Sequence, residues 1–235
     1  MSVSYADVMN LNENVPTHLE DASPVEEHAT IFQLSTQFEE ENPDPDDFVF
    51  RPDIRYGLTK KIQVEALADF MTGGDENQSG EIRTGVLYQF NDSENAVPIV
   101  SLNPVVHLPT GKESRGNDLG IKLILTSTLA GSSDRAVSQL HLNYELLHNS
   151  ARRPGERKDE GIYAFGISQR IKEKLALIVD FIHQDDIFKD RQETYIESGL
   201  HQEIGKKFYL SYALGKGVGP STPDWTGILS MELEL

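Results

Sequence analysis

The sequence predicts an all-β fold, a twelve-stranded antiparallel up-and-down transmembrane β-barrel, and three observations lead to it. From residue 29 onward, apolar and polar residues alternate with the period of two that a strand imposes. The connections between the alternating segments are long and short in turn, as they are in barrels that cross a bilayer. Aromatic residues gather near the ends of the apolar rows, where the two interfaces of a bilayer favour them.

The alternation runs through twelve segments. One of them places Phe48 and Phe50 on one face and Arg51, Asp53 and Arg55 on the other. Two segments are less regular, because Ile124 in one and Ile178 and Ile182 in another depart from the alternation. The predicted strands cover about 29–38, 47–57, 61–71, 80–91, 97–108, 118–129, 136–147, 160–170, 174–184, 192–203, 206–215 and 224–235.

The connections make the pattern more specific than alternation alone. The long ones lie near 39–46, 72–79, 109–117, 148–159, 185–191 and 216–223. The short ones lie near 58–60, 91–96, 130–135, 171–173 and 204–205. Twelve strands joined in this order leave both termini on the side of the short turns, which is the periplasmic side of outer-membrane barrels.

In such a barrel the apolar rows face lipid and the polar rows face the lumen. A Lys or Arg on the lipid side would cost about 2–4 kcal/mol at mid-depth, and the central positions of the apolar rows contain neither. Charges of both signs on consecutive strands could form a ladder of ion pairs, side by side inside the barrel. The expected lumen and selectivity residues are Arg51, Asp53, Arg55, Glu65, Asp69, Glu81, Arg83, Lys122, His141, Glu145 and Glu197. The expected membrane-interface aromatics are Phe48, Phe50, Tyr56, Phe70, Phe90, Tyr144 and Trp225.

Residues 1–28 precede the alternation and differ from it in composition. They contain six acidic residues, no Lys or Arg, and no clear period. This composition favours a flexible or surface-draped periplasmic segment. The alternative is a plug or an arm that docks a partner. The domain organisation expected is therefore an acidic segment over 1–28 followed by a barrel over 29–235.

The sequence contains no specific catalytic or cofactor-binding pattern. The chain has no cysteine, no G-x-S-x-G nucleophile elbow and no P-loop spacing. We therefore expect no enzymatic activity, no cofactor and no metal site. His107, His141 and His201 are expected to face the lumen in structural hydrogen bonds. The acidic run 39–47 is expected to be a solvated loop rather than a Ca²⁺ site.

Charge and hydropathy bear on location and partners. The formal charge of -17 argues against binding a nucleic-acid backbone. No signal peptide is visible, so we expect a mature chain whose leader has been removed, in the outer membrane of a Gram-negative bacterium. The expected partners are membrane lipid, lipopolysaccharide and a small-molecule solute. The sequence does not define the oligomeric state, and a monomer is favoured.

Four short phrases resemble a known family. They are EDASPVE at 20–26, YGLT at 56–59, LPTG at 108–111 and PDW at 223–225. In this order they resemble the outer-membrane transporters labelled "MetA-pathway of phenol degradation", over about residues 16–235. The resemblance implies a barrel of about twelve strands that passes small aromatic or hydrophobic compounds. One departure is Leu235, because such barrels usually end in an aromatic residue.

The leading functional hypothesis is a passive outer-membrane channel or transporter with a charged lumen. Because acidic residues outnumber Lys and Arg among the expected lumen residues, we expect a weak preference for cations or neutral solutes. A second hypothesis is a non-conducting structural or interaction barrel whose lumen is closed by ion pairs. A lipid-modifying enzyme and a soluble ligand-binding barrel are the remaining alternatives.

Overall fold

The structure of the chain is a computed structural model in which every strand of the barrel is defined. It describes residues 8–13, 15–40, 47–73, 78–92, 98–110, 116–129, 137–152, 154–185, 191–219 and 222–235. The strands are β1 (Thr30–Glu40), β2 (Asp47–Thr59), β3 (Ile62–Gly73), β4 (Gln78–Gln89), β5 (Ile99–Pro109), β6 (Asp118–Thr128), β7 (Ser138–His148), β8 (Asp159–Lys172), β9 (Leu175–Asp185), β10 (Gln192–Glu203), β11 (Phe208–Gly217) and β12 (Trp225–Glu234). Within the described residues, no helix is long and apolar enough to span a bilayer.

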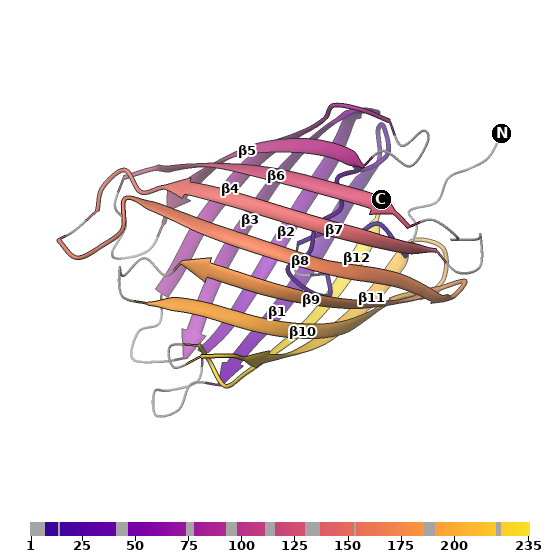
Figure 1. Cartoon of the computed structure of the whole chain (residues 1–235). Helices are drawn as coiled ribbons and strands as arrows, with labels where there is room; N and C mark the ends of the chain where they lie inside the picture. The colour runs from indigo at the N-terminus through magenta and orange to yellow at the C-terminus, as the bar shows by residue number, and fades with distance from the viewer. Residues whose placement is uncertain are drawn as a thin grey trace.

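Each strand pairs with its neighbours in sequence, all antiparallel, and β1 pairs with β12 to close the barrel (Figure 1). The prediction of a twelve-stranded up-and-down barrel is confirmed. Every strand overlaps the segment predicted for it, and the ends differ by a residue or two. Ile31 pairs with Glu234, so the first strand begins beside the end of the last one. That end of the barrel also carries the short turns.

The two faces of the sheet differ in the way the alternation predicts. Large apolar side chains such as Leu142, Phe165 and Leu229 are exposed on the outside. Gln33, Ser101 and other polar side chains of the opposite rows are buried on the inside. Because a water-soluble barrel has the reverse arrangement, the outer face is built to contact lipid.

A segment that precedes β1 enters the barrel. We call residues 8–28 the plug, with residue 14 outside the described part of the chain (Figure 1, indigo). The plug folds back on itself, since the Val15 amide donates to the Asn12 carbonyl over 2.9 Å and the Asp21 amide donates to the Leu11 carbonyl over 2.8 Å. It leaves the lumen beside β2, where Glu27 forms a parallel bridge with Gly57. A side chain at Gly57 would collide with the plug, because a Cβ there would lie 2.1 Å from the Glu26 carbonyl oxygen.

The plug packs on the barrel wall through two apolar clusters. In the larger one, plug residues contact β8, β9, β10 and β11, and its buried members are Val8, Met9, Leu11, Leu19, Ala164, Ala176, Ile178, Ile182, Tyr195 and Tyr209. In the smaller one, Ala22 of the plug packs on Leu87 and Ile124. The irregular positions of the predicted strands thereby have a physical explanation. Ile124, Ile178 and Ile182 are fully buried because they face an apolar plug instead of water.

Residues 8–28 lie inside the barrel, whereas their composition favours a flexible or surface-draped segment. The difference arises because composition records the six acidic residues and does not record how the apolar ones are spaced. Seven apolar side chains of the segment are buried against the barrel or within the plug: Val8, Met9, Leu11, Val15, Leu19, Ala22 and Val25. Residues 1–7 lie outside the described part of the chain, as do residues 41–46 of the predicted acidic loop.

Candidate functional site: the barrel lumen

The candidate site is the charged interior of the barrel, where the expected lumen residues meet the plug. Asp53, Arg55, Lys122, His141 and Glu145 are buried there, and so is Glu197. The remaining five expected residues also face the interior, and they are Arg51, Glu65, Asp69, Glu81 and Arg83. Glu65 contacts Arg55, and the other four line a cavity. The strand period is the reason that all eleven share one face.

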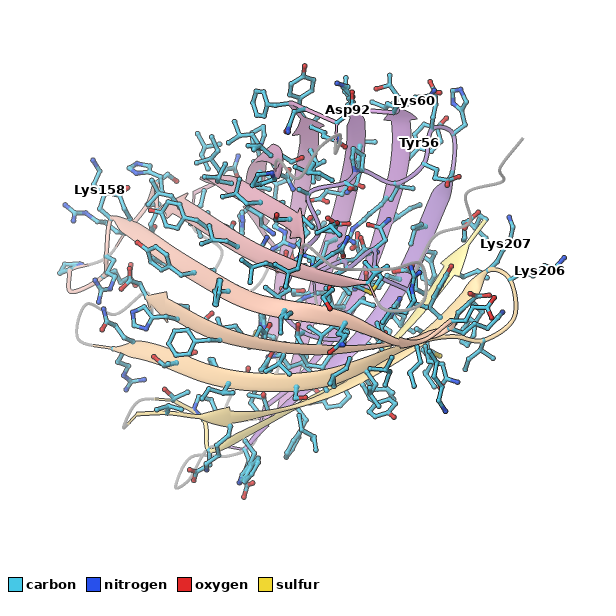
Figure 2. The ribbon with its side chains drawn as sticks, turned by 45° about the vertical axis from the view of Figure 1, so that its right-hand side comes forward. Tyr56, Lys60, Asp92, Lys158, Lys206 and Lys207 are labelled. Atoms are coloured by element: carbon cyan, nitrogen blue, oxygen red, sulfur yellow. The ribbon has the colours of Figure 1, made fainter. Side chains whose placement is uncertain are left out.

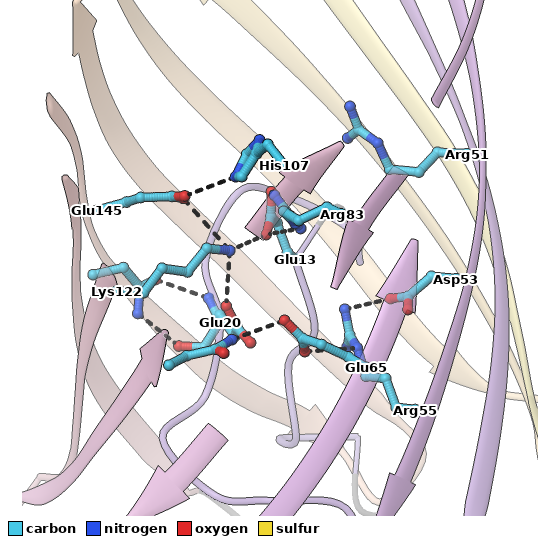
Figure 3. Close-up of polar contacts among 12 residues, drawn as sticks. Glu13, Glu20, Arg51, Asp53, Arg55, Glu65, Arg83, His107, Lys122 and Glu145 are labelled. Carbon is cyan, nitrogen blue, oxygen red and sulfur yellow. Dashed lines mark hydrogen bonds and ion pairs between the residues drawn. The ribbon is translucent and has the colours of Figure 1, made fainter. Parts of the chain in front are cut away.

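The centre of the lumen holds an ion-pair network built around Glu13 of the plug (Figure 3). The Arg83 guanidinium donates to both carboxylate oxygens of Glu13, over 3.1 and 2.6 Å. The Lys122 ammonium also donates to Glu13, and lies 3.5 Å from Glu20 and 3.6 Å from Glu145. Plug and wall therefore neutralise each other, and none of these buried charges is left without a partner of opposite sign.

Electrostatics at the plug follow from this network. Burial alone would raise the pKa of Glu13, but Arg83 and Lys122 lower it well below its usual value. Burial raises the pKa of Glu20 to about 7, although Lys122 acts in the opposite direction. Glu13 is thus the charged anchor of the plug, and Glu20 is the carboxyl that takes up a proton near neutral pH.

A second group of charges lies nearer the short turns. The Arg55 guanidinium is 2.6 Å from the Asp53 carboxylate and 3.8 Å from Glu65 (Figure 3). Glu65 also accepts a hydrogen bond from the Asn103 amide over 2.8 Å. These contacts join β2, β3 and β5. The expected ion pairs between consecutive strands therefore exist in this part of the lumen.

A third contact fixes the plug on the opposite wall. His18 Nδ1 lies 2.9 Å from Glu197 Oε2, and the Thr226 hydroxyl donates to the other oxygen of Glu197 over 3.1 Å. Burial alone would lower the pKa of His18, but the carboxylates of Glu197 and Asp180 raise it to about 9. His18 is therefore an imidazolium at neutral pH and forms an ion pair with Glu197.

Uncharged contacts tie the plug backbone to the wall. Asn143 accepts from the Glu20 amide over 2.8 Å and donates to the Glu20 carbonyl over 2.9 Å. The Ala22 amide donates to the Thr126 hydroxyl over 3.0 Å, and the Val25 amide donates to Gln63 over 2.9 Å. These side chains replace the strand partners that the plug backbone lacks, so the buried backbone groups remain satisfied.

Above the plug, at the end with the long connections, lies a cavity of about 480 Å³ that we call the vestibule. Its floor includes Glu13, His18 and Glu20 of the plug. Eight acidic side chains line it, against three Lys or Arg and the imidazolium of His18, and the acidic ones are Glu13, Glu20, Glu39, Asp69, Glu81, Asp118, Glu145 and Glu160. Acidic side chains are therefore in excess in the vestibule.

The three histidines expected in the lumen are all buried there. His107 lies 2.6 Å from Glu81 and 3.6 Å from Glu145. His141 bonds the hydroxyls of Thr126 and Ser168, over 3.2 and 2.8 Å. His201 bonds the Ser211 hydroxyl over 2.6 Å and stacks on Tyr209. In the described part of the chain, no group of three or more His, Asp or Glu could hold a metal ion.

The aromatic residues expected at the membrane interfaces lie on the outer face near the strand ends. Phe48, Phe50, Phe70, Phe90 and Trp225 are exposed. Tyr144 stacks on Tyr163 with ring centroids 4.7 Å apart. Tyr56 is partly buried, and its hydroxyl lies 3.4 Å from His28. Rings at both rims are what two bilayer interfaces require.

Sequence reasoning did not identify the plug residues that complete the site. Glu13, His18 and Glu20 have no strand period that would assign them to the lumen. A usable signal existed in the wall, where Ile124, Ile178 and Ile182 broke the alternation. Apolar side chains on a lumen face indicate that something apolar covers them.

Comparisons with known proteins identify relatives only at the level of the fold. No family model matches the chain, and no curated protein matches it. Among solved structures, the COG4313 outer membrane channel from Pseudomonas putida F1 is 14% identical, with 92% of this chain and 98% of that chain covered and a TM-score of 0.67. The NanC porin is 10% identical, with 87% of this chain and 100% of that chain covered and a TM-score of 0.62. The KdgM porin is 10% identical, with 88% of this chain and 99% of that chain covered and a TM-score of 0.57. The chain thus has the fold of outer-membrane channels and porins.

Proposed function

We propose that this protein is an outer-membrane channel for small solutes, with the vestibule as the solute entrance and the plug as the element that controls passage. The observation that carries the proposal is the acidic vestibule, whose floor is formed by Glu13, His18 and Glu20 of a separate segment. A barrel with a purely structural role has no need for an entrance that ends on such a segment.

The proposed location follows from the outer surface. The apolar rows are exposed and aromatic residues mark both rims, an arrangement that is favourable in a bilayer and unfavourable in water. We place the long connections outside the cell and the short turns in the periplasm, as in other outer-membrane barrels.

The proposed solutes are small cations and small neutral molecules. Acidic side chains outnumber Lys and Arg in the vestibule, so anions would be repelled. The KdgM porin has been solved in complex with disordered oligogalacturonate, and such a chain of carboxylates does not suit this vestibule. Val49, Met71 and Ile162 also line the cavity. They would give an aromatic or aliphatic portion of a solute an apolar surface, in agreement with the family resemblance.

The test is a recording of single-channel currents from the folded protein in planar bilayers. We expect small conductances and a reversal potential that shifts toward the cation equilibrium potential in a KCl gradient. Asp118→Asn and Glu81→Gln should reduce that shift, because each removes one vestibule charge and keeps a hydrogen-bonding group. A reversal potential on the anion side would contradict the proposed selectivity.

The second candidate is a non-conducting structural barrel. The large apolar cluster between the plug and β8–β11 favours it, because fully buried contacts hold the plug in place. The two functions differ in one measurement. A channel conducts in its wild-type form with the plug in place, and a structural barrel is silent until the plug is released by substitution.

A further inference from the structure

The short-turn end of the barrel carries a set of lysines that the channel function does not use. At three of its turns, β2–β3, β8–β9 and β10–β11, two lysines lie within the turn or at the strand end beside it. We call these six residues the lysine rim: Lys60, Lys61, Lys172, Lys174, Lys206 and Lys207. The rim is unexpected in a chain whose formal charge is -17.

Each turn divides its two lysines in the same way. One of them forms an ion pair, with distances of 3.1 Å from Lys61 to Asp92, 2.6 Å from Lys174 to Glu203 and 3.9 Å from Lys207 to Glu234. The second lysine of each turn is exposed, and no ion pair is found for it among the described residues. These three lysines are Lys60, Lys172 and Lys206. The paired lysines neutralise acidic groups of this end, and the second set remains available to an outside anion.

The turns themselves hold these lysines at the edge of the lipid-facing surface. Leu58, Ile171 and Ile204 precede the lysines of their turns, and all three are exposed large apolar residues. Leu58 and Ile171 lie on the outer rows at the ends of β2 and β8, and Ile204 directly follows β10. The β10–β11 turn is tight, since the Ile204 amide donates to the Phe208 carbonyl over 2.7 Å and Gly205 adopts a φ of 91°.

Figure 2 shows the direction of these side chains. Lys60, Lys206 and Lys207 point away from the barrel, and Lys158 lies at the opposite end, in the long β7–β8 connection. Glu26 and Glu27 of the plug also lie at the short-turn end, but Glu27 bridges Gly57 on the lumen side. Glu173 is the acidic residue inside one of the three turns.

We propose that the lysine rim binds the headgroups of anionic phospholipids in the leaflet that surrounds the short turns. The aliphatic residue of each turn would sit at the level of the upper acyl chain, and the adjacent free ammonium would meet the phosphate. Ammonium groups that lie next to a membrane surface are attracted to anionic lipid in this way. The inference rests on the membrane-spanning part of the proposed function and does not depend on conduction.

The experiment is native mass spectrometry of the full chain, folded in detergent with equimolar phosphatidylglycerol and phosphatidylcholine of the same acyl chains. We expect the wild type to retain phosphatidylglycerol preferentially. The triple variant Lys60→Gln, Lys172→Gln and Lys206→Gln should reduce the retained ratio by about fivefold or more, because each lysine near a membrane surface attracts anionic lipid. Heat-modifiable migration on a gel checks that the variant is folded.

The matched control removes three positive charges at the other end, by Arg152→Gln, Lys158→Gln and Lys216→Gln, and should leave the ratio unchanged. A third arm adds inorganic phosphate in excess, which should not displace the lipid. Equal retention of the two lipids by the wild type would overturn the proposal. An undiminished ratio in the rim variant, an equal loss in the control, or full displacement by phosphate would overturn it as well. Absence of current with an intact lipid preference would instead reject the channel and leave the rim standing.

Discussion

At the scale of single residues, His18 is the plug side chain whose positive charge strengthens docking at neutral pH and is lost on the alkaline side. It forms an ion pair with Glu197, and Asp180 and Glu13 add to the negative field around it. Its pKa is about 9 when the plug is docked, whereas a free histidine has a pKa of about 6.5. The docked state therefore binds the proton more tightly than the released state does.

This difference predicts that plug docking weakens with rising pH. His18 contributes up to roughly 3 kcal/mol to the free energy of plug docking. This contribution is fully present below a pH of about 6.5 and is lost as the pH rises through about 9. Conductance of the wild type in planar bilayers should therefore increase across that range. His18→Gln should conduct more than the wild type at neutral pH and should lack the part of the increase that lies above pH of about 7, because the titration of Glu20 near pH 7 remains. A wild-type conductance that is flat over the range would contradict the role of the ion pair.

At the scale of elements, the plug behaves as a separate piece that fits a prepared wall. Inward glycines make room for it, since a Cβ at Gly199 would lie 2.7 Å from Pro16 and one at Gly166 would lie 2.6 Å from Leu19. Leu19 is fully buried in the large apolar cluster and belongs to the plug alone. Its substitution therefore tests docking without altering any strand.

Leu19→Asp is expected to release the plug. Truncating a buried leucine costs about 2–5 kcal/mol, and a buried carboxylate without a partner adds to that cost. Single-channel conductance should rise while heat-modifiable migration of the barrel stays unchanged. Glu26→Gln is the control, because Glu26 is an exposed plug residue. If Leu19→Asp stays as closed as the wild type although the barrel is folded, the plug does not control passage.

At the scale of the whole molecule, the two faces of one closed sheet have opposite surroundings. The outer face presents apolar side chains, and the inner face holds the ion pairs and the plug. Which face contacts lipid determines where a new charge can be tolerated. Leu142 lies near the middle of β7 and is exposed on the outer face.

Leu142→Arg should destabilise the folded barrel in vesicles by about 2–4 kcal/mol, because a guanidinium near mid-depth must leave water. Leu142→Met keeps the side chain apolar and should change the unfolding free energy by less than about 1.5 kcal/mol. Urea unfolding in lipid vesicles measures both variants. Equal stabilities of the two would mean that this part of the surface is not in contact with the hydrocarbon layer.

Local sequence was sufficient to determine the barrel. The period of two and the alternation of long and short connections are properties of neighbouring residues, so the twelve strands, their order and the inward set from Arg51 to Glu197 could be predicted. The antiparallel pairing of successive strands then follows from short turns such as Ile204–Phe208.

Only the tertiary structure decided where the N-terminal segment lies and which charges meet. Glu20 contacts Asn143 across 123 positions of sequence, and Asn12 contacts Glu232 across 220. Such contacts have no local period, because they depend on the fit between an irregular segment and a completed barrel wall. The segment could be predicted as acidic from its composition. Its burial became evident only when the strands had closed and placed Ile178, Lys122 and Glu197 around it.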